Sequence, residues 1–128
     1  MQIVNLDGNS IDATEARIYL VTGPYPSDDD EYTYVYGASP KVLITMEDPE
    51  SIVSRMEKPG LMVVLTRPNG TPCWVRGTAV SSIRNPTWTD APPGGVVNAV
   101  LIVSGRHQAV QESVIEVKKA VNLVGAKL

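Results

Sequence analysis

The segment LTRPNGTPCWV, residues 65–75, contains the strongest local signal in the chain. Its Asn69-Gly70 pair favours a two-residue turn of type I′, because both central residues of that turn need positive φ angles. The strand-like runs LMVVLTR and PCWV lie before and after the pair. The segment therefore predicts a β-hairpin.

An earlier segment, IVNLDGNSIDA at residues 3–13, has the same pattern around Asp7-Gly8. We call the displacement that places Gly8 on Gly70 the hairpin shift. The same displacement pairs three further apolar positions, namely Ile11 with Cys73, Ala13 with Val75, and Ile18 with Val80. We therefore expect a second hairpin, followed by a further strand.

Farther along the chain the two halves align at a slightly larger shift, as if a loop differed in length. On this shift Glu47 aligns with Glu112, Ile52 with Val117, and Met56 with Val121. Each half then reads strand, turn, strand, strand, loop, strand, turn, strand, helix. One interpretation is an internal duplication, and the alternative is a coincidental similarity of two β-hairpin sequences.

Each half ends in a predicted helix. In EDPESIVSRMEK, residues 47–58, Asp48 is a good N-cap and a proline follows it in the first turn. In ESVIEVKKAVNLVG, residues 112–125, Ser113 and Glu116 have the spacing of a capping box. The apolar stripes of both helices predict packing against sheets rather than ligand binding.

These patterns predict a β-rich α+β fold with mostly antiparallel strands. We expect two tandem strand-hairpin-plus-helix units, residues 1–60 and 61–128, that share one core within one compact domain.

Composition excludes several classes of protein. A net charge of −3 over 128 residues does not favour broad nucleic-acid binding. The single cysteine excludes an intramolecular disulfide framework and fits a reducing compartment. The N-terminus has no signal-peptide pattern, and the longest apolar run, residues 99–103, is too short for a membrane helix. We therefore expect a cytoplasmic protein or a component of a virion, without a membrane partner.

The second half also resembles a known family. The segments LTRPNGTPCWV, AVSSI, NAVLIVSG and QAVQESVIEVKKAV are similar to the small flagellar-associated proteins of the FlbD/SwrD type, over about residues 63–123. That family shares a hairpin motif of the form L-T-R-x-[ND]-G-x-P. The resemblance implies an accessory or assembly role without catalytic residues. Small β modules of this kind also fit phage accessory proteins.

Few residues indicate catalysis. His107 would need an acid–base partner such as Glu112, and the alternative is an exposed turn histidine. Cys73 has the setting of a small core residue. The acidic run SDDDE, residues 27–31, attracts a hard cation or is a solvated loop, and it lacks the EF-hand spacing. One cysteine and one histidine do not make a zinc site, so we expect no metal, no cofactor and no enzyme.

The loops at residues 23–31 and 85–96 occupy the same position in the two halves, and each contains prolines and an aromatic side chain. The aromatic side chain would pack on its own domain, on a neighbouring subunit or on a ligand. Arginine beside an aromatic ring suits an anionic, planar ligand such as a nucleotide. The candidate binding residues are Arg84, Trp88, Asn98, Arg106, His107 and Tyr25.

Small sheets expose edges, which self-association would close. The first functional hypothesis is therefore a non-catalytic homo-oligomeric structural or assembly protein, in a ring or a compact even-numbered assembly. Other structural proteins, such as those of a phage particle, would be its partners. The alternative is a small-molecule binding protein that sequesters an anionic metabolite or nucleotide at subunit interfaces. A third hypothesis, an enzyme, lacks an acid–base pair.

Overall fold

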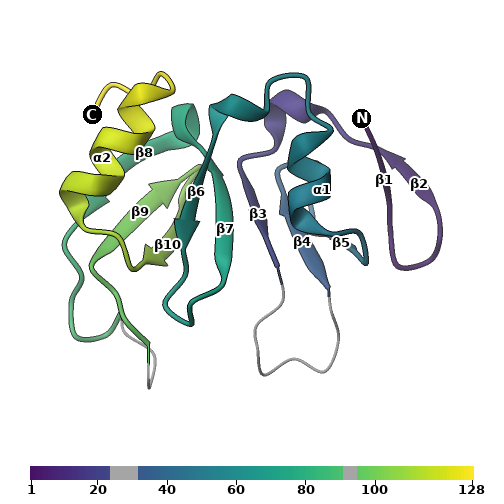
Figure 1. Ribbon diagram of the computed structural model, residues 1–128. Helices are drawn as coiled ribbons and strands as arrows, with labels where there is room; N and C mark the ends of the chain where they lie inside the picture. Colours follow the sequence, from purple (N-terminus) through teal and green to yellow (C-terminus); the bar gives the residue numbers. More distant parts are fainter. Residues whose placement is uncertain (24–31, 91–94) are drawn as a thin grey trace.

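The computed structural model describes residues 1–23, 32–90 and 95–128 (Figure 1). Within these ranges ten strands form three antiparallel sheets, and two α-helices accompany them. This confirms the predicted β-rich α+β class. Neither helix in the described part is long and apolar enough to cross a membrane.

The order of elements is the same in the two halves of the chain. The first half contains β1 (Gln2–Val4), β2 (Ser10–Asp12), the 3-10 helix η1 (Glu15–Arg17), β3 (Leu20–Thr22), β4 (Thr33–Tyr36), β5 (Leu43–Thr45) and α1 (Pro49–Ser54). A short 3-10 helix, η2 (Pro59–Leu61), follows. The second half contains β6 (Met62–Thr66), β7 (Pro72–Arg76), η3 (Gly77–Ala79), β8 (Val80–Arg84), β9 (Ala99–Val103), β10 (Arg106–Val110) and α2 (Val114–Leu123).

One sheet contains strands from both halves. Its order is β5-β4-β3-β7-β6, and the other two sheets are β1-β2 and β10-β9-β8. At the centre of the five-stranded sheet β3 pairs with β7, and Leu20, Val21 and Thr22 lie opposite Val75, Trp74 and Cys73 respectively. The boundary predicted at residue 60 falls within η2, and the β3–β7 pair joins the halves on either side of it.

The two hairpin turns differ from the predicted type I′. Gly8 and Gly70 have φ angles of 84° and 88°, but neither Asp7 nor Asn69 has a positive φ. The Gly8 N–H donates to the Asn5 carbonyl at 3.1 Å, which closes a turn before the left-handed glycine. The predicted two-residue loop is therefore wrong, because a loop of three residues needs only its last residue in the left-handed region.

The turn between β9 and β10 instead has two consecutive positive φ angles. They are 47° at Ser104 and 80° at Gly105, and the flanking residues Val103 and Arg106 are paired. This is the pattern of a type I′ turn.

The predicted capping box at α2 is confirmed. The Glu116 N–H donates to Ser113 Oγ at 3.2 Å, and the Ser113 N–H donates to a carboxylate oxygen of Glu116 at 3.2 Å. Asp48 occupies the N-cap position of α1, where its side chain makes no capping hydrogen bond. The second helix therefore has the better defined start.

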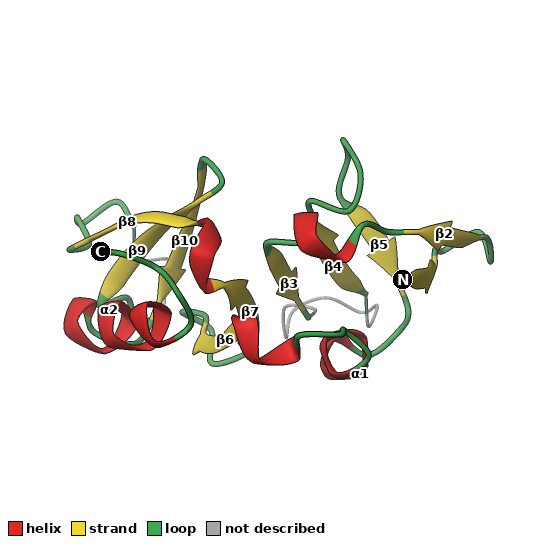
Figure 2. Ribbon diagram, turned by 90° about the horizontal axis from the view of Figure 1, so that it is seen from above, coloured by secondary structure: helices red, strands yellow, loops and turns green. Residues whose placement is uncertain are grey.

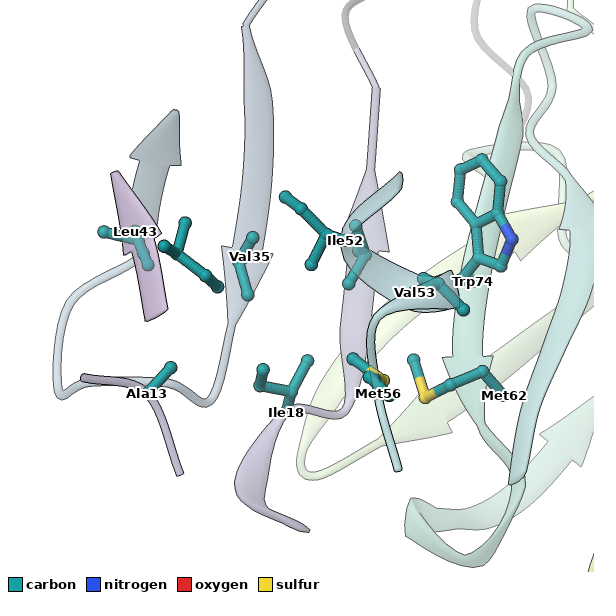
Figure 3. Close-up of a cluster of buried hydrophobic side chains, with 11 residues drawn as sticks. Ala13, Ile18, Val35, Leu43, Ile52, Val53, Met56, Met62 and Trp74 are labelled. Atoms are coloured by element: carbon teal, nitrogen blue, oxygen red, sulfur yellow. The ribbon is translucent and has the colours of Figure 1, made fainter. Parts of the chain in front are cut away.

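Buried apolar side chains form two clusters, which corrects the expectation of one shared core. The first contains Ile18 and Ile52 of the first half together with Met62 and Trp74 of the second (Figure 3). The second contains residues of the second half together with Leu20 of the first.

Alternation along the central strands explains the division into two clusters. Successive side chains of a strand point to opposite faces of the sheet. Val21 and Trp74 belong to the first cluster, whereas Leu20 and Val75 belong to the second. The β3–β7 pair, which we call the β3–β7 wall, therefore separates the two clusters and contributes side chains to one cluster on each face.

Candidate functional site

Two glutamates occupy equivalent structural positions. Glu47 accepts a hydrogen bond from the N–H of Val4 in β1 at 2.9 Å. Glu112 accepts one from the N–H of Thr66 in β6, also at 2.9 Å. Val4 and Thr66 correspond under the hairpin shift. Each carboxylate therefore ties the first strand of its half to the segment before the helix.

These contacts also bear on the suggested pair of His107 and Glu112. A carboxylate oxygen of Glu112 accepts from the hydroxyl of Thr66 at 2.9 Å, in addition to the backbone N–H. Both contacts give Glu112 a structural role in holding β6.

The pKa of Glu47 reflects its contacts. Burial opposes ionisation, but the hydrogen bonds from Arg55 and from the Val4 N–H outweigh it and lower the pKa. Arg55 lies 2.7 Å from Glu47 Oε1 and donates as well to the Gln2 carbonyl at 3.1 Å. The outer edge of β1 is therefore occupied by side chains.

Two edge strands lie far apart in the described part of the chain. β8 pairs only with β9, and β2 pairs only with β1. The β1–β2 hairpin lies at one end of the molecule and β8 at the other (Figures 1 and 2). Unpaired N–H and carbonyl groups along an edge are a template for another strand.

A tyrosine-lined cleft lies where β4 approaches β10. The guanidinium carbon of Arg106 is 4.3 Å from the ring centroid of Tyr36, and the rings of Tyr36 and Tyr19 are 6.3 Å apart. A cleft of about 240 Å³ lies nearby, lined by Thr22, Tyr34, Tyr36, Arg67 and Gln108. Arg67 is buried and donates to the Gly23 carbonyl at 2.8 Å. The arrangement combines cationic and aromatic groups.

The predicted binding residues do not form one group. Arg84 lies opposite Val100 on β9, whereas Arg106 lies opposite Val103. The two arginines are therefore separated by roughly 10 Å along the strand direction. His107 lines a shallow hollow with Arg106 and Tyr19, and Asn98 donates to the Gln111 carbonyl at 2.7 Å.

The Arg84 side chain is engaged within its own loop. Its two terminal nitrogens lie 2.8 and 3.1 Å from the carboxylate of Asp90, which also accepts from the Thr87 N–H at 2.6 Å. The hydrogen bond from Arg84, and then that from Thr87, hold the pKa of Asp90 far below its usual range. The Trp88 side chain is 91% exposed, so it does not pack on the described part of the chain.

Other predicted positions carry no site in the described residues. Cys73 is buried, and burial raises the pKa of its thiol to about 12, which removes it as a nucleophile. No cluster of three metal-binding side chains occurs among residues 1–23, 32–90 and 95–128. Tyr25 and the whole acidic run at 27–31 lie in the range 24–31, outside the described residues.

Comparison with protein-family models, with curated proteins and with solved structures gives no match. The resemblance to the FlbD/SwrD-type proteins stays a prediction. Sequence reasoning missed both the separated edges and the cleft. The alternating tyrosines of YTYVY, residues 32–36, signal the cleft, because residues two apart share one face of a strand.

Proposed function

We propose that this protein is a non-catalytic structural protein that assembles from copies of itself through the edges of its sheets. The observation that carries the proposal is that β2 and β8 are edge strands at opposite ends of the molecule. Edges at both ends allow each copy to contact two neighbours.

The composition of these edge strands supports this function. Edge strands of monomeric proteins are usually blunted by charged side chains, proline, bulges, short length or a covering element. β2 reads SID and β8 reads VSSIR, so each has one charged residue and no proline, and β8 has a register shift between Val80 and Ser82. Ile11 and Ile83 are only partly buried, so pairing with another strand would remove apolar surface from water.

Such a protein would suit a phage particle or an accessory apparatus in the cytoplasm, because both use many copies of small subunits. Other structural proteins of the same assembly would then be its partners.

Native mass spectrometry and analytical ultracentrifugation over a wide range of protein concentration test the proposal. We expect oligomers whose fraction grows with concentration. A monomer at every concentration would contradict the proposed function.

A second function is favoured by the cleft beside Arg106. An arginine over the ring of Tyr36, which lines the cleft together with Tyr34, suits an anionic planar ligand. We expect adenosine monophosphate, but not inorganic phosphate alone, to raise the melting temperature of the native chain. An Arg106→Gln variant should lose that increase, whereas Arg17→Gln, an exposed change on η1, should retain it. No increase with any nucleotide would exclude nucleotide binding at this cleft.

A further inference from the structure

The five-stranded sheet is built from two recognisable pieces. One is the three-stranded piece β5-β4-β3 of the first half, and the other is the hairpin β7-β6 of the second. The remaining sheets are the corresponding pieces with the halves exchanged, namely β10-β9-β8 and β2-β1. Within the described residues, β3 pairs with β7 and joins the first two pieces into one sheet. The corresponding strands β8 and β2 do not pair with each other.

Backbone hydrogen bonds support the correspondence of the hairpins. The Asn5 N–H donates to the Asn9 carbonyl at 2.9 Å, and the Arg67 N–H donates to the Thr71 carbonyl at 2.8 Å. The hairpin shift places the first of these pairs on the second. β2 is therefore the structural counterpart of β7.

The same shift relates the strands that follow. It places η1, Glu15–Arg17, on η3, Gly77–Ala79, and these 3-10 helices lead into β3 and β8. Leu20 then corresponds to Ser82 and Val21 to Ile83. β8 is therefore the counterpart of β3.

The other edge strands do not differ between the halves in this way. β5 and β10 are both the outer strands of their three-stranded pieces, and β1 and β6 are both outer strands of their hairpins. Among the strands of the described residues, β2 and β8 alone lack a neighbour that their counterparts β7 and β3 possess. The pattern of the chain therefore singles out these two edges.

Burial distinguishes the joined strands from their counterparts. All three residues of β3 are buried, and in β7 every residue from Cys73 to Arg76 is buried. In β8 the central Ser81 and Ser82 are exposed, and in β2 no residue is fully buried. A strand paired with the free edge of β8 or β2 would bury these exposed residues.

We propose that β8 of one copy pairs with β2 of a second copy, antiparallel and in the register of the internal β3–β7 pair. This pairing, which rests on the proposed structural function, completes a five-stranded sheet across two chains. The register places Ser82, Ile83 and Arg84 opposite Ala13, Asp12 and Ile11 of the second copy respectively. Because β2 and β8 lie at opposite ends, the contact is head-to-tail and repeats from copy to copy.

The side chains fit the two faces of this junction. Ile83 packs against the second hydrophobic cluster of its own chain, as Val21 packs in the first. Ala13 belongs to the first cluster and Ile11 packs against it. Their counterparts Val75 and Cys73 both belong to the second cluster. Corresponding residues thus face corresponding cores.

The junction is weaker than the internal pair. Ser82 and Asp12 occupy the positions at which the internal pair has Leu20 and Trp74. Less apolar surface is buried, so the association is reversible and depends on concentration.

Disulfide cross-linking between two different variants tests the register. One chain carries Ile83→Cys and the other carries Asp12→Cys, while Cys73 stays in place because it is buried in both. Residues directly opposite in antiparallel strands bring their Cβ atoms close enough for a disulfide. We expect a cross-linked dimer when the two variants are mixed and mildly oxidised, and none from either variant alone or from the native chain.

A register control uses Ile11→Cys in place of Asp12→Cys. A slip of one residue points the side chain to the other face of the sheet, so we expect at least a tenfold lower yield with Ile83→Cys. A second control replaces an exposed serine in each of two elements. Ser82→Lys in β8 should abolish oligomers, and Ser54→Lys in α1 should retain them.

The results separate this inference from the proposed function. Cross-linking of the Ile83→Cys chain to itself would show pairing of β8 with β8 and overturn the inference. Oligomers without a cross-link at the predicted register would also overturn it and leave the structural function standing. A native chain that is monomeric at every concentration would overturn both.

Discussion

β3 and β8 occupy corresponding places in the two halves, but in the described part of the chain β3 has a neighbouring strand on each side and β8 on one side only. The exposure of their side chains differs accordingly. β3 lies between two strands and reads LVT, and all of it is buried. β8 has one neighbouring strand and contains two exposed serines. The residues of β8 are therefore suited to an edge that is exposed to water. Serine tolerates both water and a sheet, whereas leucine at an exposed edge would favour aggregation.

The largest expected difference is in thiol reactivity between corresponding positions of β7 and β2. In an Ile11→Cys chain, dilute enough to be monomeric, we expect the new thiol to react with a disulfide reagent while Cys73 does not. Cys73 is buried, and burial raises the pKa of its thiol to about 12, so little reactive thiolate forms there. Mass spectrometry should count one label in the native state and two after denaturation. Two labels in the native state would show that β7 is not held as the structure has it.

The two hydrophobic clusters should unfold together despite being separate. Ile52 and Leu101 are both fully buried, one in each cluster. We expect Ile52→Ala and Leu101→Ala each to lower the free energy of unfolding by about 2–5 kcal/mol. Denaturation followed by circular dichroism should show one transition in both variants, because the β3–β7 wall belongs to both cores. Separate transitions for the two variants would mean that the halves fold independently.

A smaller effect is expected where η3 packs on α2. A methyl group at Gly77 would overlap Val124 Cγ2 and come within 3.2 Å of the Val121 carbonyl. We expect Gly77→Ala to cost about 1–3 kcal/mol through overpacking. The corresponding residue of η1 is Glu15, and the helix of that half, α1, has 6 residues where α2 has 10.

The partner variant Val124→Ala sharpens that test. In the double variant with Gly77→Ala, chemical denaturation should recover part of the lost stability, because the overlapping methyl is gone. If the double variant is no more stable than Gly77→Ala alone, the overlap with Val124 is not the cause of the lost stability.

The smallest expected effect is that of Glu47 on stability at different pH values. Because the pKa of Glu47 is lowered on folding from 4.5, its ionised form stabilises the fold above that pH, and this contribution is lost as the pH falls below it. We expect Glu47→Gln to cost about 1 kcal/mol or less at pH 7 and a smaller amount at pH 3. Glu57→Gln, an exposed change outside the helix, is the matched control, without an effect at either pH. Equal losses at both pH values would mean that the charge of Glu47 plays no part.

Local signals in the sequence predicted local structure well. Both hairpins, the start of α2 at Ser113 and the β-rich class follow from turn glycines, capping residues and alternation, which act over a few residues. The turn type at Asp7 and Asn69 was wrong, because Asx-Gly pairs serve both two-residue loops and three-residue loops that need one positive φ. The candidate binding residues were chosen for their chemistry, and those in the described ranges lie on several parts of the fold.

The chain alone determined where strands, turns and helices form, and that the two halves follow one pattern. Only the tertiary structure decided that β3 pairs with β7, because that choice depends on contacts between residues far apart along the chain. Pairing of that kind is set by which apolar faces can be buried together, not by the propensity of either strand. The β3–β7 pairing also separates the buried residues into two clusters, and it leaves β2 and β8 with one unpaired edge each in the described residues.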